Sequence, residues 1–206
     1  MQQLVFATAN RHKLEEVQAM LPDNLQIRSL SDIGFTGEIP ETGATLEDNA
    51  LQKARFIHER YGAPCFADDT GLETEALDGA PGVHSARYAG AEGSQEERDK
   101  ANMARLLHEL AGKSGRNARF RTVIAYIDAD NREHLFEGTV NGSIIEDAAG
   151  SKGFGYDPVF MPDGYGITYA QMALCEKNLI SHRAKAFQKF AEAIREANCL
   201  MSRVEL

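Results

Sequence analysis

The chain opens with an alternation of strand and helix patterns, and this alternation limits the folds it can adopt. Residues 4–9 form a short apolar run that leads to Asn10, a sequence typical of a buried strand followed by a helix cap. Apolar residues then recur at helical spacing until Pro22 supplies a stop. After another helix pattern, residues 64–67 are again typical of a buried strand. We therefore expect an α/β fold.

Three later segments have helical patterns. Thr45 can cap a helix that ends near Tyr61 and Gly62, because its apolar residues fall on one face. A second helix is expected over residues 96–111. The last strong helix is expected over residues 181–198, with a frayed tail beyond it.

Between the last two helices, the pattern changes to that of strands. Residues 119–145 are rich in β-branched and aromatic side chains, which predicts antiparallel strands that form a second lobe. Residues 79–88 are rich in glycine, proline and small residues and are expected to be a compact loop, and residues 150–163 are rich in glycine.

Charge and cysteine content narrow the range of functions. The formal net charge of -9 disfavours non-specific attraction to nucleic-acid phosphates. The three cysteines lack CxxC spacing, so we expect no disulfide framework or zinc site, and a reducing cytoplasm fits them. We recognise no secretory leader and no apolar run that approaches the roughly 20 residues needed to span a bilayer. We expect no nucleic-acid partner, no membrane and a cytoplasmic location.

Two adjacent carboxylates, Asp68 and Asp69, directly follow the second predicted strand. Ligands of α/β proteins bind at the carboxyl ends of strands, and carboxylates held there could coordinate a hard cation such as Mg²⁺. Adjacent aspartates also initiate turns or cap helices, so the pair alone leaves both interpretations open. Glu41, Glu47 and Lys53 could complete a cleft of mixed charge, although solvated helix charges would give the same pattern.

Two other groups of residues could bind a nucleotide. Thr8, Asn10 and Lys13 lie where the first helix begins, and backbone N–H groups at a helix start attract phosphate. Phe154 and Tyr156 lie among glycines, a composition suited to stacking a flat base, although a packed turn is the competing interpretation. Donors that could reach such a base follow later in the sequence: Lys177, Ser181, His182 and Arg183.

Together these motifs resemble the inosine/xanthosine triphosphate pyrophosphatase family (Ham1-like), which removes non-standard purine nucleotides from the precursor pool. The resemblance covers nearly the whole chain. At Thr70 the chain departs from the serine of many members, but the hydroxyl is kept. Six ordered motifs carry the resemblance: residues 8–13, 41–50 with Lys53, 68–72, 79–88, 154–158 and 181–183.

The resemblance implies an α/β fold with an elongated mixed β-sheet and flanking helices, in which two lobes surround a central active-site cleft. Residues 1–206 would form a single pyrophosphatase domain. The implied activity is Mg²⁺-dependent cleavage of ITP, dITP or XTP between the α and β phosphates, by a cytoplasmic homodimer. The products would be the nucleoside monophosphate and pyrophosphate.

Residue roles follow from the resemblance by matching position. Asp69 would be the general base, and Glu41, Asp68 and Asp69 would serve the metal, with the division of roles between the two aspartates left open. The implied substrate-binding residues are Thr8, Ala9, Asn10, Arg11, His12, Lys13, Lys53, Thr70, Phe154, Gly155, Tyr156, Asp157, Lys177, His182 and Arg183.

Purine selection is expected to depend on hydrogen-bond donors. Hypoxanthine and xanthine carry a 6-oxo group where adenine has an amine, so donors aimed at that oxygen would favour the former. Lys177, His182 and Arg183 are the candidates for these donors.

Three other enzyme or binding functions compete with this interpretation. A related pyrophosphatase of the septum-inhibitor type would act on pyrimidine or modified nucleotides, and the motifs at Phe154 and Ser181 argue against it. A nucleotide sensor without turnover is disfavoured by the set Glu41, Asp68, Asp69 and Lys53, because binding alone does not need a water-activating carboxylate. A DNA-binding function is disfavoured by the acidic balance and by the lack of a basic helix or stripe.

Overall fold

The computed structural model describes the backbone of residues 2–204 and the side chains of residues 2–197. Four short 3-10 turns connect its main elements, at Ser31–Ile33, Glu75–Leu77, Ser85–Arg87 and Tyr169–Gln171. In chain order the main elements are β1 (Gln2–Phe6), α1 (Arg11–Gln18), β2 (Leu25–Arg28), α2 (Leu46–Tyr61), β3 (Cys65–Thr74), β4 (Pro81–Gly82), α3 (Gln95–Glu109), β5 (Asn117–Ile127), β6 (Glu133–Ile144), β7 (Phe160–Pro162), α4 (Leu174–Ile180) and α5 (His182–Val204).

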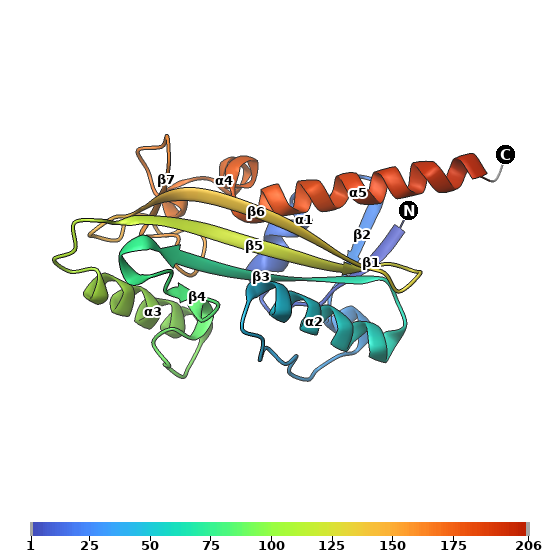
Figure 1. The fold of residues 1–206 in the computed structure, drawn as a ribbon, viewed down its shortest axis with the longest axis horizontal. Helices are drawn as coiled ribbons and strands as arrows, with labels where there is room; N and C mark the ends of the chain where they lie inside the picture. Colours follow the sequence, from blue (N-terminus) through green and yellow to red (C-terminus); the bar gives the residue numbers. More distant parts are fainter. Residues whose placement is uncertain (1, 205–206) are drawn as a thin grey trace.

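The strands form one mixed sheet in the order β2-β1-β3-β5-β6-β7, with β4 paired to β3. β1 is parallel to β2 and β3, whereas β3, β5 and β6 form a long antiparallel ladder. Figure 1 shows β5 and β6 running along the length of the molecule, with helices on both sides of the sheet. The predicted elongated α/β fold with a mixed sheet and two lobes around a cleft is confirmed.

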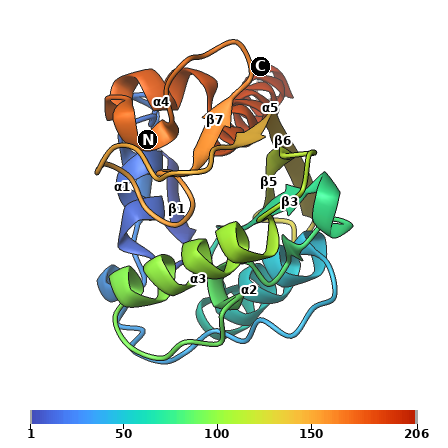
Figure 2. The ribbon, with the colours of Figure 1, turned by 90° about the vertical axis from the view of Figure 1, so that its left-hand side faces the viewer.

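Strand alternation assigns the helices to the two faces of the sheet. Cys65 and Ala67 of β3 belong to the core under α2, whereas Phe66 packs against α5. These two cores lie at the end of the molecule that carries β1 and β2. A third core lies toward α3 and β7, at the other end of the long strands (Figures 1 and 2). Its central members include Leu72, Leu106, Phe120, Val140, Phe160 and Tyr169.

The long ladder corrects two predictions. Asp68 and Asp69 do not follow a strand but lie in the middle of β3, because every residue from Cys65 to Thr74 pairs with β5 and polar side chains do not interrupt that ladder. Residues 119–145 do contain antiparallel strands, but they do not form a lobe of their own. β5 and β6 instead extend through both lobes and connect them.

The helix predictions were correct in position and less so in length. α3 begins at Gln95 and ends at Glu109, close to the predicted bounds. α5 begins at His182 and reaches Val204, beyond the end predicted at residue 198. Within the described chain, no helix is both long enough and apolar enough to cross a membrane.

An opening in the sheet lies beside the middle of β3. On the edge opposite β5, β1 pairs with Cys65 and Phe66, and β4 pairs with Leu72 and Glu73. Among the described strands, none covers the segment between these two pairings. Asp68 and Asp69 therefore lie at the opening. Because successive side chains of a strand alternate, they point to opposite faces of the sheet.

Gly138 of β6 allows α5 to begin directly on the sheet. A Cβ atom at this position would overlap the carbonyl oxygen of His182 and lie 2.5 Å from the backbone nitrogen of Ala186. Both obstacles are backbone atoms, so they cannot rotate away. Gly138 therefore allows the start of α5, which carries His182 and Arg183, to pack directly against β6.

Gly138→Ala should lower the free energy of unfolding by roughly 1–3 kcal/mol, because the added methyl forces α5 away from β6. Gly115→Ala is the matched control: an added Cβ there meets no atom within 4 Å, and the change should cause no loss of stability. Urea denaturation of both variants measures the difference. Equal stability of the two variants would contradict the close seating of α5.

Candidate active site

A cleft opens at the gap in the sheet, between the two lobes. Its volume is about 520 Å³, within the range of small-molecule sites. Arg11, His12 and Asp68 are the predicted site residues that do not contribute to its lining. The predicted residues that do line it are Thr8, Ala9, Asn10, Lys13, Glu41, Lys53, Asp69, Thr70, Phe154, Gly155, Tyr156, Asp157, Lys177, His182 and Arg183.

The start of α1 forms one end of the cleft. Asn10 caps this helix: its Oδ1 accepts hydrogen bonds from the backbone N–H groups of His12 and Lys13, at 3.0 and 3.2 Å. These two N–H groups are therefore not free for a ligand, contrary to the expectation from the sequence. Thr8, Ala9, Asn10 and the Lys13 side chain line the cleft and are the groups of this segment that can meet an anion there.

Asp69 is held from the α2 side by two donors. Asn49 Nδ2 donates to its Oδ2 at 3.0 Å, and the Lys53 ammonium lies 3.3 Å from its Oδ1. The same ammonium lies 2.5 Å from Glu41 Oε1. Asn49 also accepts a hydrogen bond from the backbone of Gly43, which fixes the loop that carries Glu41. Both carboxylates are thus positioned around one cation at the cleft.

Lys53 stays charged in this setting. Burial by itself would lower the pKa of its ammonium, but the carboxylates of Asp69, Glu41 and Asp68 outweigh burial and raise that pKa. The cleft therefore contains a fixed positive charge between two negative ones.

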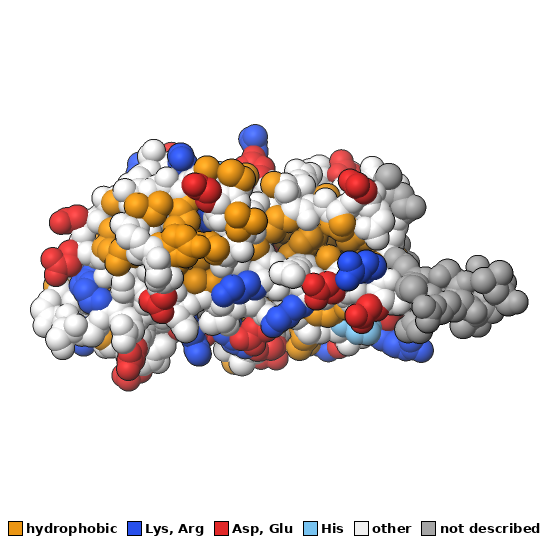
Figure 3. Space-filling view, turned by 90° about the horizontal axis from the view of Figure 1, so that it is seen from above, with side chains coloured by type: hydrophobic (Ala, Val, Ile, Leu, Met, Phe, Trp, Pro, Cys, Tyr) orange, Lys and Arg blue, Asp and Glu red, His pale blue; other side chains and the backbone are white. Residues whose placement is uncertain are grey.

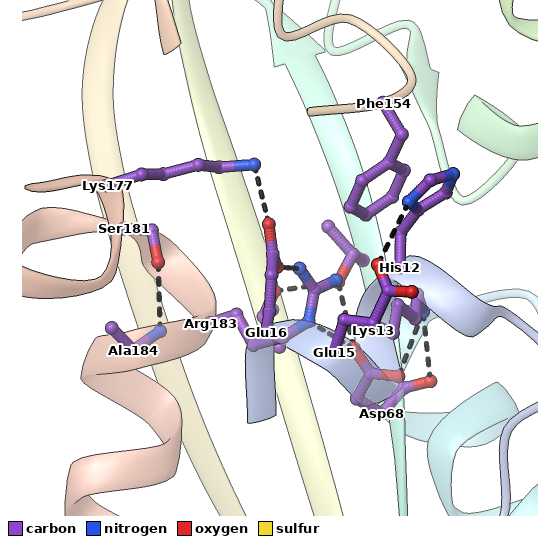
Figure 4. Close-up of polar contacts among 12 residues, drawn as sticks. His12, Lys13, Glu15, Glu16, Asp68, Phe154, Lys177, Ser181, Arg183 and Ala184 are labelled. Carbon is purple, nitrogen blue, oxygen red and sulfur yellow. Dashed lines mark hydrogen bonds and ion pairs between the residues drawn. The ribbon is translucent and has the colours of Figure 1, made fainter. Parts of the chain in front are cut away.

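Asp68 points to the other face and belongs to a buried series of ion pairs (Figure 4). The Lys13 ammonium lies 2.9 Å from its Oδ1, and Arg183 Nε donates to its Oδ2 at 3.0 Å. Arg183 also donates to Thr70 Oγ1 at 3.1 Å, so the hydroxyl kept at that position holds the guanidinium. Thr70 in turn shares a 2.7 Å hydrogen bond with Thr122 of β5.

The series continues through Glu16 of α1. This carboxylate pairs with Arg183 through Nη1 and lies 2.7 Å from the Lys177 ammonium, as Figure 4 shows. Lys177 ends the series at Asp157, at 2.5 Å. Three carboxylates and three cations therefore alternate, and their formal charges cancel. In order, they are Asp157, Lys177, Glu16, Arg183, Asp68 and Lys13.

The ion pairs determine the ionisation of the two central carboxylates. Burial by itself would raise the pKa of Asp68, but Lys13, Arg183 and Lys53 hold that pKa well below its usual range. Glu16 follows the same rule: burial would raise its pKa, and Arg183 and Lys177 lower it. Both side chains are therefore carboxylates at neutral pH.

His182 is a neutral polar group at the cleft. Its ring stacks on Phe120, with centroids 4.5 Å apart and planes 14° apart. Burial, and then the charges of Arg183 and Lys177, push the pKa of its imidazole well below the usual value. Its Nδ1 has no hydrogen-bond partner among the described residues.

The loop with Phe154 forms the aromatic wall of the cleft. Its backbone is fixed by two carboxylates: Asp157 accepts from the N–H of Phe154 at 3.0 Å, and Asp99 of α3 accepts from the N–H of Gly155 at 2.8 Å. Tyr156 is buried, and its hydroxyl donates to the carbonyl oxygen of Ser85 at 2.9 Å, so it anchors the loop.

Comparison with known proteins agrees with this geometry. Residues 4–193 match the profile of the Ham1 family. The chain belongs to the Ham1 family. It is 53% identical over 184 residues to the dITP/XTP pyrophosphatase of Flavobacterium psychrophilum, across 89% of this chain and 94% of that protein. Its identity to the dITP/XTP pyrophosphatase of Porphyromonas gingivalis is 54% over 187 residues, with coverage of 90% and 94%.

Solved structures of Ham1 proteins share the fold. The Ham1 protein of Staphylococcus aureus superimposes with a TM-score of 0.83 at 36% identity, covering 96% of this chain and all of that one. The Ham1 protein of Coxiella burnetii gives a TM-score of 0.84 at 35% identity, covering 95% and 100%. The family resemblance seen in the sequence is thereby confirmed.

In this Ham1 protein the three predicted metal-binding carboxylates do not surround one point. Within the described part of the chain, no group of three or more His, Cys, Asp or Glu side chains could hold a metal ion. Asp68 is bound to two cations on one face, whereas Glu41 and Asp69 converge on the other. Mg²⁺ is commonly held by one or two carboxylates plus substrate phosphates and water. Glu41 and Asp69 fit that donor set.

Several residues of the site were not identified from the sequence as functional. Glu16 is 4% exposed, although most glutamates are exposed, and its partners are remote in sequence. Asn49 and Asp99 act through hydrogen bonds that only the folded chain assembles. The one available signal was helical spacing, which places Glu16 three residues after Lys13 on the buried side of α1.

Arg183→Met should lower the free energy of unfolding by about 3–5 kcal/mol, because Glu16 and Asp68 would stay buried after losing a cation. Arg55→Met provides the control, since Arg55 makes a comparable two-point contact with Glu133 at the exposed surface, where such pairs contribute at most about 1 kcal/mol. Urea unfolding at neutral pH compares the two. Similar losses of stability in the two variants would show that the buried ion pairs of Arg183 stabilise the fold no more than an exposed pair does.

Acid should weaken the fold through Glu16 and Asp68. Their folded pKa values are depressed, so below about pH 4 the unfolded chain binds protons that the folded chain does not, and stability falls as the pH falls. Glu16→Gln should reduce this slope by up to about 1.4 kcal/mol per pH unit. Unfolding curves measured between about pH 5 and about pH 2 test this prediction. Glu59→Gln, at an exposed position, is the control. An unchanged slope in Glu16→Gln would contradict the assignment.

Proposed function

We propose that this enzyme hydrolyses dITP, ITP and XTP to the nucleoside monophosphate and pyrophosphate with Mg²⁺, and so removes deaminated purines from the nucleotide pool. As a Ham1 family member similar to dITP/XTP pyrophosphatases, the chain is a nucleoside triphosphate pyrophosphatase. One observation carries the finer proposal: a single cleft joins a charged end at Lys13, Lys53 and Asp69 to an aromatic end at Phe154 and His182.

The charged end suits the triphosphate and the attacking water. Lys13 and Lys53 offer ammonium groups to phosphate oxygens, and Asp69 would accept the proton of the water because Asn49 and Lys53 fix both of its oxygens. Glu41 and Asp69 would hold Mg²⁺ together with the phosphates. When bound, this ion would neutralise phosphate charge and make its water more acidic.

Asp68 is better suited to orienting cations than to holding the metal. Both of its oxygens already bind the side chains of Lys13 and Arg183, and it does not line the cleft. Asp69 also has both oxygens bonded, to Asn49 and Lys53, so the distinction rests on the cleft lining, which includes Asp69 and not Asp68. We therefore assign proton transfer to Asp69 and the placement of Lys13 to Asp68.

The aromatic end suits an oxo-purine. Phe154 provides a face on which a base can stack. Among the predicted donors, His182 is a neutral ring in the lining of the cleft, whereas Lys177 is already bound by two carboxylates. His182 is therefore the donor we favour for the 6-oxo group. A homodimer and a cytoplasmic location complete the proposal.

Pyrophosphate release from dITP, ITP, XTP, GTP and ATP, each with Mg²⁺ and with chelator, tests the activity. Release should be Mg²⁺-dependent and favour dITP, ITP and XTP, and Asp69→Asn should lower kcat by roughly 10²–10⁴-fold, the usual contribution of a general base. Asp130→Asn, at an exposed turn, is the control and should retain full activity.

Three outcomes would change this conclusion. Binding of dITP without release of pyrophosphate would indicate a nucleotide sensor. Faster turnover of pyrimidine triphosphates than of dITP would indicate the septum-inhibitor type. Full activity in Asp69→Asn would remove Asp69 from the role of general base.

A further inference from the structure

One residue expected to bind substrate lies outside the cleft lining and yet contacts its aromatic wall. The His12 ring stacks on the Phe154 ring, with centroids 5.2 Å apart and planes 11° apart (Figure 4). Phe154 lines the cleft and His12 does not. The imidazole therefore supports the ring from the side away from the cleft.

We propose that His12 is a positioning residue that holds Phe154 ready for the nucleobase and does not bind the phosphates. This inference rests on the proposed function, because it takes Phe154 as the stacking surface for the base. It assigns His12 a different role from that of its neighbours Asn10 and Lys13, which belong to the phosphate end.

The Phe154 ring needs such support because its loop constrains the backbone more than the side chain. Gly153 and Gly155 on either side have positive φ angles of 73° and 61°, a conformation that suits glycine. The hydrogen bonds to Asp157 and Asp99 fix two backbone N–H groups of the loop. Neither bond sets the plane of the ring. The parallel imidazole of His12 does so, together with Lys177 Nζ and Arg183 Cζ, which lie 5.2 and 5.7 Å from the ring centroid.

The environment of His12 argues against phosphate binding. Its Nδ1 lies 3.6 Å from Glu15 Oε2, a carboxylate that would repel an anion placed there. Its backbone N–H is occupied by Asn10. One face of its ring is against Phe154, so its remaining contacts are with solvent and Glu15 and not with the cleft.

The stack also connects the two ends of the substrate. His12 is the second residue of α1, and the next residue, Lys13, lines the charged end. Through His12, the position of the base-stacking ring depends on the position of α1, the helix that faces the phosphates. A base and a triphosphate must be placed together for the α phosphate to reach Asp69, so this connection serves the reaction.

Equilibrium binding separates positioning from phosphate contact. Calorimetry would measure the dissociation constants of α,β-imido-dITP, which is not cleaved between the α and β phosphates, and of tripolyphosphate, each with Mg²⁺. His12→Ala should weaken binding of the nucleotide about 2- to 10-fold, the worth of one aromatic pair, and leave tripolyphosphate unchanged. His12→Phe should restore nucleotide binding, because it keeps the stack without a charge. His108→Ala, at an exposed position of α3, is the control.

Two results would overturn the inference. Weaker tripolyphosphate binding in His12→Ala that His12→Phe fails to restore would make His12 a phosphate ligand. Unchanged nucleotide binding in His12→Ala would show that Phe154 needs no support. If the wild type binds α,β-imido-dITP but releases no pyrophosphate from dITP, the proposed hydrolysis fails, and the ratios of dissociation constants still decide the role of His12.

Discussion

The buried guanidinium of Arg183 is the interaction on which the site depends. It is 1% exposed and joins three elements, because it contacts Glu16 of α1 and both Asp68 and Thr70 of β3 from the start of α5. A charge at that depth is tolerated only with paired and well-oriented partners. The positions of α1, β3 and α5 are consequently set together, and the cleft lies where they meet.

Strand alternation gives the two adjacent aspartates different roles. Asp68 and Asp69 are neighbours in sequence, but the pleat of β3 directs one toward Arg183 and the other toward Lys53. A carboxylate that holds cations in place and a carboxylate that is available to a ligand can therefore stand side by side. The gap between β1 and β4 makes this arrangement possible, because it leaves the middle of the strand accessible at its edge.

The sequence predicted the parts of the fold that depend on local patterns. Helix caps at Asn10 and Thr45 and the apolar run before Asp68 were visible because capping and burial act over a few residues. The length of β3 was not visible, since it is set by pairing with β5, a segment more than forty residues away. Glu16 was missed for the same reason: its burial is compensated by Lys177 and Arg183 from the other end of the chain.

His182 is a polar ring of the cleft that the ion-pair network does not include. Within the series from Asp157 to Lys13 each charge has a partner, so the protein satisfies this part by itself. His182 Nδ1 is buried without a partner among the described residues, whereas the Phe154 ring has the His12 imidazole and the cations of Lys177 and Arg183 against it. Lys177 and Arg183, the cations of this network that lie over the Phe154 ring, are themselves fixed by Asp157, Glu16 and Asp68. The ion pairs therefore hold the aromatic wall of the cleft in place together with the start of α5, which carries His182.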